Sequence, residues 1–262
     1  MPNVTFATRP SPIKLRLLSP ISKRHRAKRS LLAQPYAIQD IIHQLVLTDD
    51  KKMLFVRNFK AGCSSVTHLL YEFSKGHVFA GNISDAPDFM RGVPYWPHME
   101  PALSASDVYR FTMVRHPQTR AVSAFRDFFI DGRNREAARY EGILGEFGAS
   151  TEASIDEKFD AYLAFISYCL TENPEGTDPH FRRQVTNTAF GTMRYDRICR
   201  LETYADDMER VFAEAGAALP KSASLTKKKN VSQGAKVFVP SPAQQEEIRA
   251  LYRADFEAFS YT

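Results

Sequence analysis

The sequence has few cysteines and no long apolar run. Its three cysteines, Cys63, Cys169 and Cys199, lie far apart and none forms a C-x-x-C pair. The sequence therefore indicates neither a disulfide framework nor a zinc site, and a reducing, cytoplasmic location is the simpler expectation. It contains no stretch of about 18 apolar residues, so we expect no transmembrane segment. The basic amino-terminal stretch also lacks the apolar core of a signal peptide.

Positive charge is in small excess. Lys and Arg number 35 against 30 Asp and Glu, for a net charge of +5. This excess favours an anionic ligand but does not distinguish a nucleotide from a polyanion. Hydrophobic residues make up 44% of the chain and charged residues 25%, which excludes global disorder. Residues 1–30 are rich in Arg, Lys, Pro and Ser and are predicted to be a basic, disordered tail. Residues 31–262 are predicted to form a single domain.

One early stretch has the pattern of a strand, a loop and a helix. Met53 to Val56 form a short apolar run, and apolar residues at helical spacing begin at Val66. The loop between them, FKAGCSS, contains Lys60 and Gly62. Such a loop points backbone N–H groups and a helix N-terminus at an anion. It is not a Walker A motif, in which the lysine follows the second glycine.

A second strand followed by a helix contains an arginine at their junction. The strand is predicted over 108–114, and Pro117 suits the first turn of the helix. Arg115 therefore stands at the carboxyl end of a strand, where open α/β sheets bind ligands. Ser123 lies within the helix. Spacing alone leaves open whether Arg115 binds a ligand or pairs with a carboxylate.

Together the two motifs resemble those of a known enzyme family. FVRNFKAGCSS is similar to the 5′-phosphosulfate loop of the carbohydrate sulfotransferases that use 3′-phosphoadenylyl sulfate (PAPS), the group that includes the chondroitin 4-O- and HNK-1 enzymes. FTMVRHPQTRAVSAFRD is similar to their 3′-phosphate motif, and the likeness continues through HFRRQ to LYRADFEAFSY. Phe59 stands where the family usually has proline. The membrane anchor of the animal enzymes is missing, as expected of a bacterial member.

The resemblance implies both a fold and an activity. The fold would be α/β, a three-layer, P-loop-like sulfotransferase fold with a central, mostly parallel sheet. The activity would be in-line transfer of the sulfuryl group from PAPS to a hydroxyl of a carbohydrate, either a poly- or oligosaccharide or a glycolipid. The product nucleotide would be PAP, no metal would be required, and no nucleic-acid partner is expected.

It also implies roles for particular residues. The donor's 5′-phosphosulfate would be bound by the loop residues Arg57, Lys60, Ala61, Gly62, Cys63, Ser64 and Ser65. Lys60 would also be catalytic, because it would neutralise charge on the leaving phosphate. Arg115 and Ser123 would hold the 3′-phosphate, over which a basic loop containing Lys228 and Lys229 would lie.

The acceptor hydroxyl needs a general base, usually a histidine, and two histidines are candidates. His98 lies between the two phosphate motifs in the chain, where other sulfotransferase folds carry a catalytic histidine, and we favour it slightly for that reason. His180 opens HFRRQ, which matches a family motif written H-W-x-P-Q. There Arg182 or Arg183 would help to bind an anionic acceptor.

Two other functions are weighed against this one. A P-loop-type ATP phosphotransferase would use a similar loop, but the position of Lys60 and the missing Walker B aspartate argue against it. A non-catalytic polyanion-binding protein would instead use the basic tail and the lysines at 227–229.

Overall fold

The computed structural model describes residues 22–86, 89, 91–220 and 238–262. They form two compact units where the sequence predicts a single domain. The sheet unit consists of residues 22–114 and 186–220, and the helical unit of residues 115–185 and 238–262. Each unit has its own hydrophobic core.

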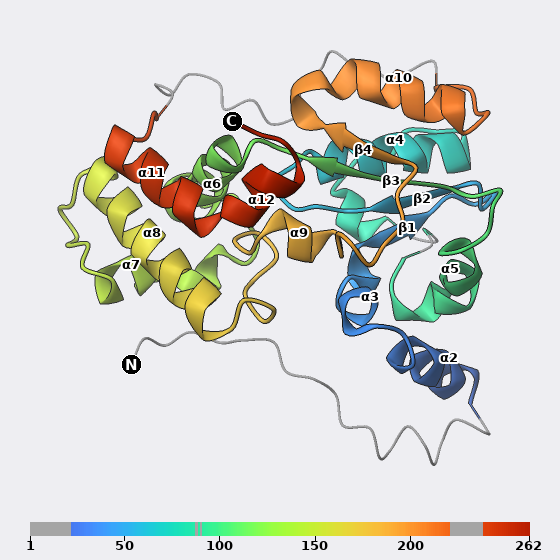
Figure 1. Cartoon of the computed structure of the whole chain (residues 1–262), viewed down its shortest axis with the longest axis horizontal. Helices are drawn as coiled ribbons and strands as arrows, with labels where there is room; N and C mark the ends of the chain where they lie inside the picture. The colour runs from blue at the N-terminus through green and yellow to red at the C-terminus, as the bar shows by residue number, and fades with distance from the viewer. Residues whose placement is uncertain (1–21, 87–88, 90, 221–237) are drawn as a thin grey trace. The chain divides into compact units, whose positions relative to one another are not determined.

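The sheet unit contains one four-stranded sheet in the order β1-β2-β3-β4. Its strands are β1 (Leu45–Leu47), β2 (Met53–Val56), β3 (Tyr109–Val114) and β4 (Arg197–Arg200). β1 runs antiparallel to β2, whereas β2, β3 and β4 are parallel (Figure 1). The carboxyl ends of these three strands therefore lie at the same end of the sheet. The predicted central, mostly parallel sheet is confirmed.

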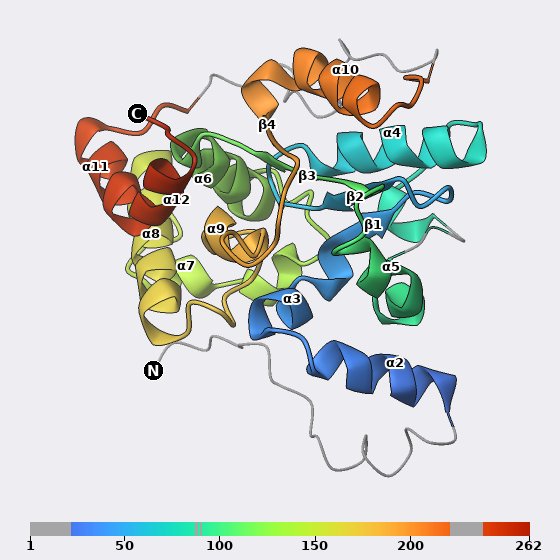
Figure 2. The same ribbon diagram turned by 45° about the vertical axis from the view of Figure 1, so that its right-hand side comes forward.

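Helices cover both faces of this sheet (Figures 1 and 2). They are α2 (Lys23–Leu32), α3 (Tyr36–Asp40), α4 (Cys63–Lys75), α5 (Trp96–Ala102) and α10 (Tyr204–Glu214), with the short 3₁₀ helices η1 (Ile42–Gln44), η2 (Ile83–Asp85), η3 (Val93–Tyr95) and η6 (Leu201–Thr203). Because successive strand residues point to opposite faces, Val46 and Phe55 pack in a core with α4 and α10. Leu45 and Leu54 pack in a second core with α2, α3 and α5. The sheet unit is thus built in three layers.

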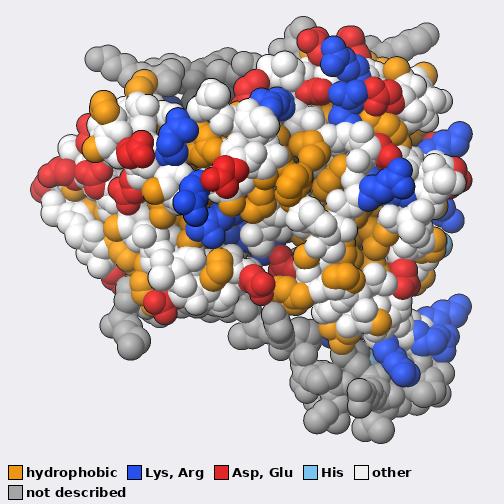
Figure 3. All heavy atoms as spheres, in the orientation of Figure 1, with side chains coloured by type: hydrophobic (Ala, Val, Ile, Leu, Met, Phe, Trp, Pro, Cys, Tyr) orange, Lys and Arg blue, Asp and Glu red, His pale blue; other side chains and the backbone are white. Residues whose placement is uncertain are grey.

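Part of the predicted basic tail is helical. The sequence predicts a disordered tail over 1–30, but α2 covers its last residues, and the prediction was wrong there. Ala27 and Leu31 of α2 are buried, and the Ser30 hydroxyl donates to the Glu100 carboxylate of α5. Lys and Arg side chains lie over the outer side of α2 (Figure 3). Burial of one face of α2 therefore stabilises a helix in a segment whose high charge predicts disorder. The residues before 22 lie outside the described ones.

The helical unit is held together mainly by aromatic side chains. Its elements are α6 (Pro117–Phe125), the π-helical turn η4 (Arg126–Ile130), the 3₁₀ turn η5 (Ala137–Tyr140), α7 (Ile143–Glu146), α8 (Ile155–Glu172), α11 (Pro242–Leu251) and α12 (Arg253–Ala258). The short α9 (Gln184–Asn187) spans the point where the chain passes from this unit to the sheet unit. Ring centroids lie 4.9 Å apart for Phe125 and Phe159 and 4.8 Å apart for Phe128 and Phe181. These contacts support the segment that carries His180.

Candidate functional site

The loop between β2 and α4 has a backbone conformation that favours glycine at one position. Gly62 has φ +78°, and a Cβ there would lie 2.7 Å from Cδ1 of Leu201. Gly62 is also the N-cap of α4 and has no side chain with which to cap it. The N–H groups of the first helical turn, at Cys63, Ser64 and Ser65, have no acceptor within the helix. These N–H groups are suited to an anion, and the phosphate that the sequence predicts for this loop stays a prediction.

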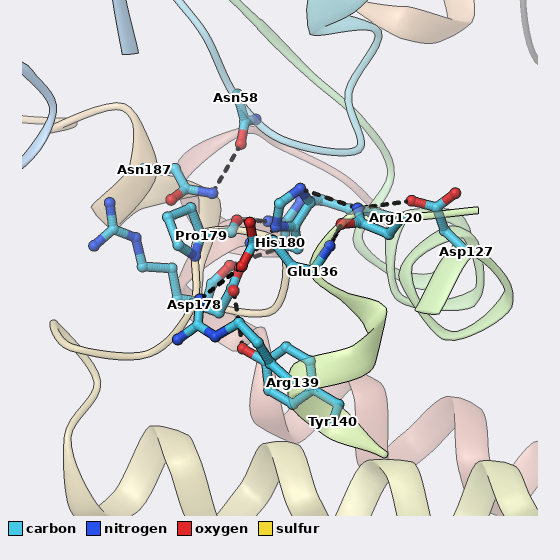
Figure 4. Close-up of polar contacts among 12 residues, drawn as sticks. Asn58, Arg120, Asp127, Glu136, Arg139, Tyr140, Asp178, Pro179, His180 and Asn187 are labelled. Carbon is cyan, nitrogen blue, oxygen red and sulfur yellow. Dashed lines mark hydrogen bonds and ion pairs between the residues drawn. The ribbon is translucent and has the colours of Figure 1, made fainter. Parts of the chain in front are cut away.

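Lys60 and Asn58 define the conformation of the same loop. Lys60 has φ +63°, a region that costs a residue with a side chain on the order of 1–3 kcal/mol and that clusters at ligand sites. Asn58 is fully buried. Its Nδ2 donates to the Met113 carbonyl at 3.0 Å, and its Oδ1 accepts from Asn187 at 3.3 Å (Figure 4). Asn58 therefore ties the loop to the end of β3, a role that sequence reasoning missed.

The other predicted loop residues differ in whether their side chains are buried or exposed to solvent. Arg57 is buried, and its guanidinium lies 5.4 Å from the ring centroid of Phe59, the residue that replaces the family proline. Ala61 and Cys63 are also buried, so they present backbone rather than side chain. Ser64 is exposed on the first turn of α4. Charge and hydroxyl donors at the loop surface thus come from Lys60 and the serines.

In the helical unit, Arg115 lies just before α6 and Ser123 lies within it. Arg115 follows the end of β3 and precedes α6, whereas Thr119 and Ser123 lie four residues apart within α6, which places these two side chains on one helix face. The Arg115 Nε donates to the Thr119 hydroxyl at 3.0 Å. Thr119 is a second residue that sequence reasoning missed, although its spacing was a usable signal.

Buried polar side chains join this motif to the HFRRQ segment. The Gln184 amide makes two hydrogen bonds to the Arg115 backbone, accepting from its N–H at 3.0 Å and donating to its carbonyl at 2.8 Å. The Asp255 carboxylate accepts from the backbone N–H groups of Gln184 at 2.8 Å and Val185 at 2.9 Å. The predicted 3′-phosphate motif and HFRRQ are therefore one rigid assembly within the helical unit.

The arginine side chains near this assembly donate hydrogen bonds to backbone carbonyls. Arg120 is only 1% exposed and donates to the carbonyls of Arg182 at 2.9 Å and Pro179 at 3.0 Å. Arg182 donates to the Glu175 carbonyl and Arg183 to the Leu251 carbonyl, each at 2.9 Å. These contacts favour a structural role for Arg182 and Arg183 over the predicted contact with an anionic acceptor.

His180 is held by an aspartate (Figure 4). Its Nδ1 lies 2.7 Å from Oδ1 of Asp178, and the two side chains are 16% and 10% exposed. The Tyr140 hydroxyl donates to the other oxygen of Asp178 at 2.8 Å. Burial by itself would raise the pKa of Asp178, but the hydrogen bonds and charge of His180, with the Tyr140 hydrogen bond, outweigh it and lower this pKa to about 2. Asp178 is therefore an ionised acceptor at neutral pH.

The lowered pKa of Asp178 predicts a pH dependence of stability. A carboxyl whose pKa falls from 3.8 to about 2 on folding contributes about 2 kcal/mol to the free energy of unfolding above pH 4. That contribution is lost as the pH falls from about 4 to 2, because protonation then favours the unfolded chain. Urea unfolding at several pH values should show this slope. An Asp178→Asn variant should lack it, and an equal slope in that variant would assign the effect to other carboxyls.

The structure does not bring His98 and Lys60 together. His98 is exposed on α5, and that helix ends beside the start of β3, where the Ala102 carbonyl accepts from Nε of Arg110 at 3.0 Å. Lys60 follows the carboxyl end of β2, at the opposite end of the sheet. Lys228 and Lys229 lie outside the described residues.

Comparison with known proteins identifies the family. A model of the family described as "Sulfotransferase family" matches residues 43–262. The chain belongs to the sulfotransferase family. The match confirms the resemblance drawn from the two motifs, and it covers Lys60, Arg115 and His180.

One curated relative matches about two thirds of this chain. Human carbohydrate sulfotransferase 9 is 26% identical over 194 residues, which are 67% of this chain and 42% of that protein. The chain thus spans less than half the length of the relative. No solved structure matches. Among the described residues, no helix has the length and apolar composition needed to cross a membrane. In the same part of the chain, no group of three or more His, Cys, Asp or Glu side chains is placed to hold a metal ion.

Proposed function

We propose that this family member transfers a sulfuryl group from PAPS to a hydroxyl of a carbohydrate. The observation that carries the proposal is the loop after β2, in which Lys60 is followed by a positive-φ glycine, Gly62, and by a first turn of α4 that has no side-chain cap. The match to the sulfotransferase family includes this loop. The carbohydrate class is supported by the name of the human relative. The cytoplasmic location suggested by the cysteine pattern stays a prediction.

The loop residues would act on the donor's leaving group. PAPS supplies the sulfuryl group on a 5′-phosphate that gains negative charge as the sulfur–oxygen bond breaks. Lys60 brings a positive charge to that phosphate, and the N–H groups of Cys63, Ser64 and Ser65 bring hydrogen-bond donors. Donors fixed before the reaction stabilise developing charge without reorganisation. These residues therefore stabilise the transition state more than the bound donor.

Arg115 and Ser123 are assigned to the 3′-phosphate. Arg115→Ala or Ser123→Ala should weaken binding of PAPS by roughly 10–100-fold, the scale of a lost hydrogen bond to a charged group. Binding of adenosine 5′-phosphosulfate, which lacks the 3′-phosphate, should change little. Calorimetric titration of each variant with both ligands measures the difference.

The matched control for this experiment is Arg133→Ala. Arg133 belongs to the same unit, and its side chain is 55% exposed, so its loss should affect neither ligand. Equal losses of affinity for both nucleotides in the Arg115 and Ser123 variants would instead show that these residues shape the protein rather than bind the 3′-phosphate.

The general base is assigned to His180 rather than His98. A base needs a fixed ring and a nitrogen with a lone pair directed at the hydroxyl. His180 has a carboxylate on its Nδ1, and it lies in the segment bonded to the 3′-phosphate motif. His98 lies at the other end of the sheet from Lys60. This assignment reverses the order that chain position alone favoured.

A transfer screen with radiolabelled PAPS tests the function. The label is expected in polysaccharides, oligosaccharides or glycolipids and not in simple phenols. Labelling of phenols alone would contradict the carbohydrate class. Tight binding of ATP with none of PAPS would favour the ATP phosphotransferase. If neither nucleotide binds and polyanions do, the protein is a binding module instead.

A further inference from the structure

The hydrogen bonds of Asp178 determine which nitrogen of His180 carries a proton. An ionised carboxylate can only accept hydrogen bonds, and Asp178 is ionised because its pKa is lowered to about 2. The Nδ1 of His180, 2.7 Å from Oδ1 of Asp178, must therefore be the donor. In the neutral imidazole the lone pair is then on Nε2.

The surroundings of Nε2 agree with this tautomer. The Nδ2 of Asn134 lies 3.5 Å from Nε2 and also donates to the Asp127 carboxylate at 3.0 Å. Since a carboxylate cannot donate, the contact with Asp127 fixes the orientation of the Asn134 amide. Nε2 therefore faces a hydrogen-bond donor. A sugar hydroxyl would be a donor of the same kind.

Tyr140 holds the far side of the carboxylate. Its hydroxyl donates to Oδ2 of Asp178 at 2.8 Å, so the two oxygens of Asp178 have separate donors. Its ring packs against Phe128 at 5.5 Å and Phe181 at 5.2 Å between centroids. The Phe128 ring also meets the His180 imidazole edge to face at 5.0 Å. Tyr140 is thus fixed by the aromatic core, and its hydroxyl is the group aimed at Asp178.

We propose that Asp178 and Tyr140 are positioning residues that hold His180 with Nε2 ready to accept a proton, an inference that rests on the proposed function. The proton of the acceptor hydroxyl moves to Nε2, and the hydroxyl oxygen keeps the electron pair that forms its bond to sulfur. The bond between sulfur and the 5′-phosphate oxygen of PAPS breaks at the same time, its electron pair stays on that oxygen, and PAP leaves. The imidazolium produced is stabilised by the Asp178 carboxylate. Tyr140 keeps that carboxylate from turning away.

A simpler role for Asp178 has to be separated from this one. Oδ1 also accepts from the backbone N–H of His180 at 2.9 Å, the contact of an Asx turn, which shapes a loop without any part in catalysis. A turn residue would affect folding and the binding of both substrates. A positioning residue would affect turnover and the state of the imidazole.

Kinetics of two conservative variants make the first comparison. Asp178→Asn should lower kcat by a factor on the order of 10²–10⁴, because the amide no longer fixes the tautomer or stabilises the imidazolium. Tyr140→Phe should lower kcat roughly fivefold, the effect of one hydrogen bond, with its ring packing kept. KM for the acceptor should stay the same in both. Tyr162→Phe is the matched control, since it removes a buried hydroxyl of the same core that donates to the Ala121 carbonyl instead.

Nitrogen-15 NMR of the histidine rings in the full chain makes the second comparison and needs no turnover. The His180 signals are identified by their loss in His180→Asn. In the unaltered protein the proton should be on Nδ1, and in Asp178→Asn both tautomers should appear. Tyr140→Phe should keep the tautomer and raise the pKa of Asp178, because the ionised form loses a donor.

The kinetics and the NMR together separate the positioning role of Asp178 and Tyr140 from the proposed role of His180 as the base. An unchanged tautomer in Asp178→Asn, or a loss in KM rather than kcat, would overturn the positioning role. If the NMR changes occur but His180→Asn still has normal turnover, the hydrogen bonds among Tyr140, Asp178 and His180 exist but His180 is not the base. Circular dichroism of each variant identifies any that fail to fold. If Asp178→Asn does not fold, Tyr140→Phe tests the positioning role instead, through its kcat and the pKa of Asp178.

Discussion

His180→Asn is expected to lower turnover by a factor on the order of 10²–10⁴, the usual contribution of a general base. The asparagine amide can still donate to Asp178, so the contact at 2.7 Å that fixes this loop is largely kept. What the variant loses is a nitrogen that can accept the acceptor's proton. Single-turnover transfer from labelled PAPS measures the chemical step, and titration with PAP should show unchanged affinity.

His98→Ala is the comparison variant for His180→Asn, because His98 is the other candidate for the base. His98 is exposed on α5, so its removal should leave turnover within about twofold, as for an ordinary surface substitution. If instead His98→Ala is inactive with normal binding of both substrates while His180→Asn is active, the base is His98. If both variants are active, the base is a carboxylate.

The parts of the site that depend on local pattern could be predicted from the sequence. The apolar run of β2, the glycine after it and the helical spacing of α4 are neighbours in the chain, so short-range rules apply to them. The same holds for β3 and for Arg115 directly after it. Parallel strands then place their carboxyl ends together. The sheet was therefore predicted correctly, and the role of the loop in binding an anion stays a prediction.

Contacts between distant segments could not be predicted in this way. Tyr140 reaches Asp178 from a polar stretch without a regular pattern, and their hydrogen bond joins residues 38 positions apart. His98 shows the same limit, because its place between two motifs in the chain does not determine its place in space. The division into two units falls between Val114 and Arg115, inside a motif, where composition does not change.

Lys60→Ala is expected to lower turnover by a factor on the order of 10²–10³, the scale of a lost transition-state donor. The lysine charge matters most when the 5′-phosphate becomes more negative, so kcat should fall further than the affinity for PAPS. Stability should change little, because alanine meets the same left-handed backbone, φ +63°, that lysine now occupies. Pre-steady-state transfer and thermal unfolding measure the two effects separately.

Lys52→Ala is the matched control for Lys60→Ala. Lys52 is an exposed lysine directly before β2, at the other end of the strand that leads to the loop. Both variants lose one positive charge from the same unit, so any general effect of charge on attraction of an anionic donor is shared. Only the Lys60 variant should lose turnover. Equal, small losses that disappear at high salt would mean that Lys60 attracts the donor from a distance, and the stabilising charge at the leaving phosphate would then have to come from Arg57 or from the first turn of α4.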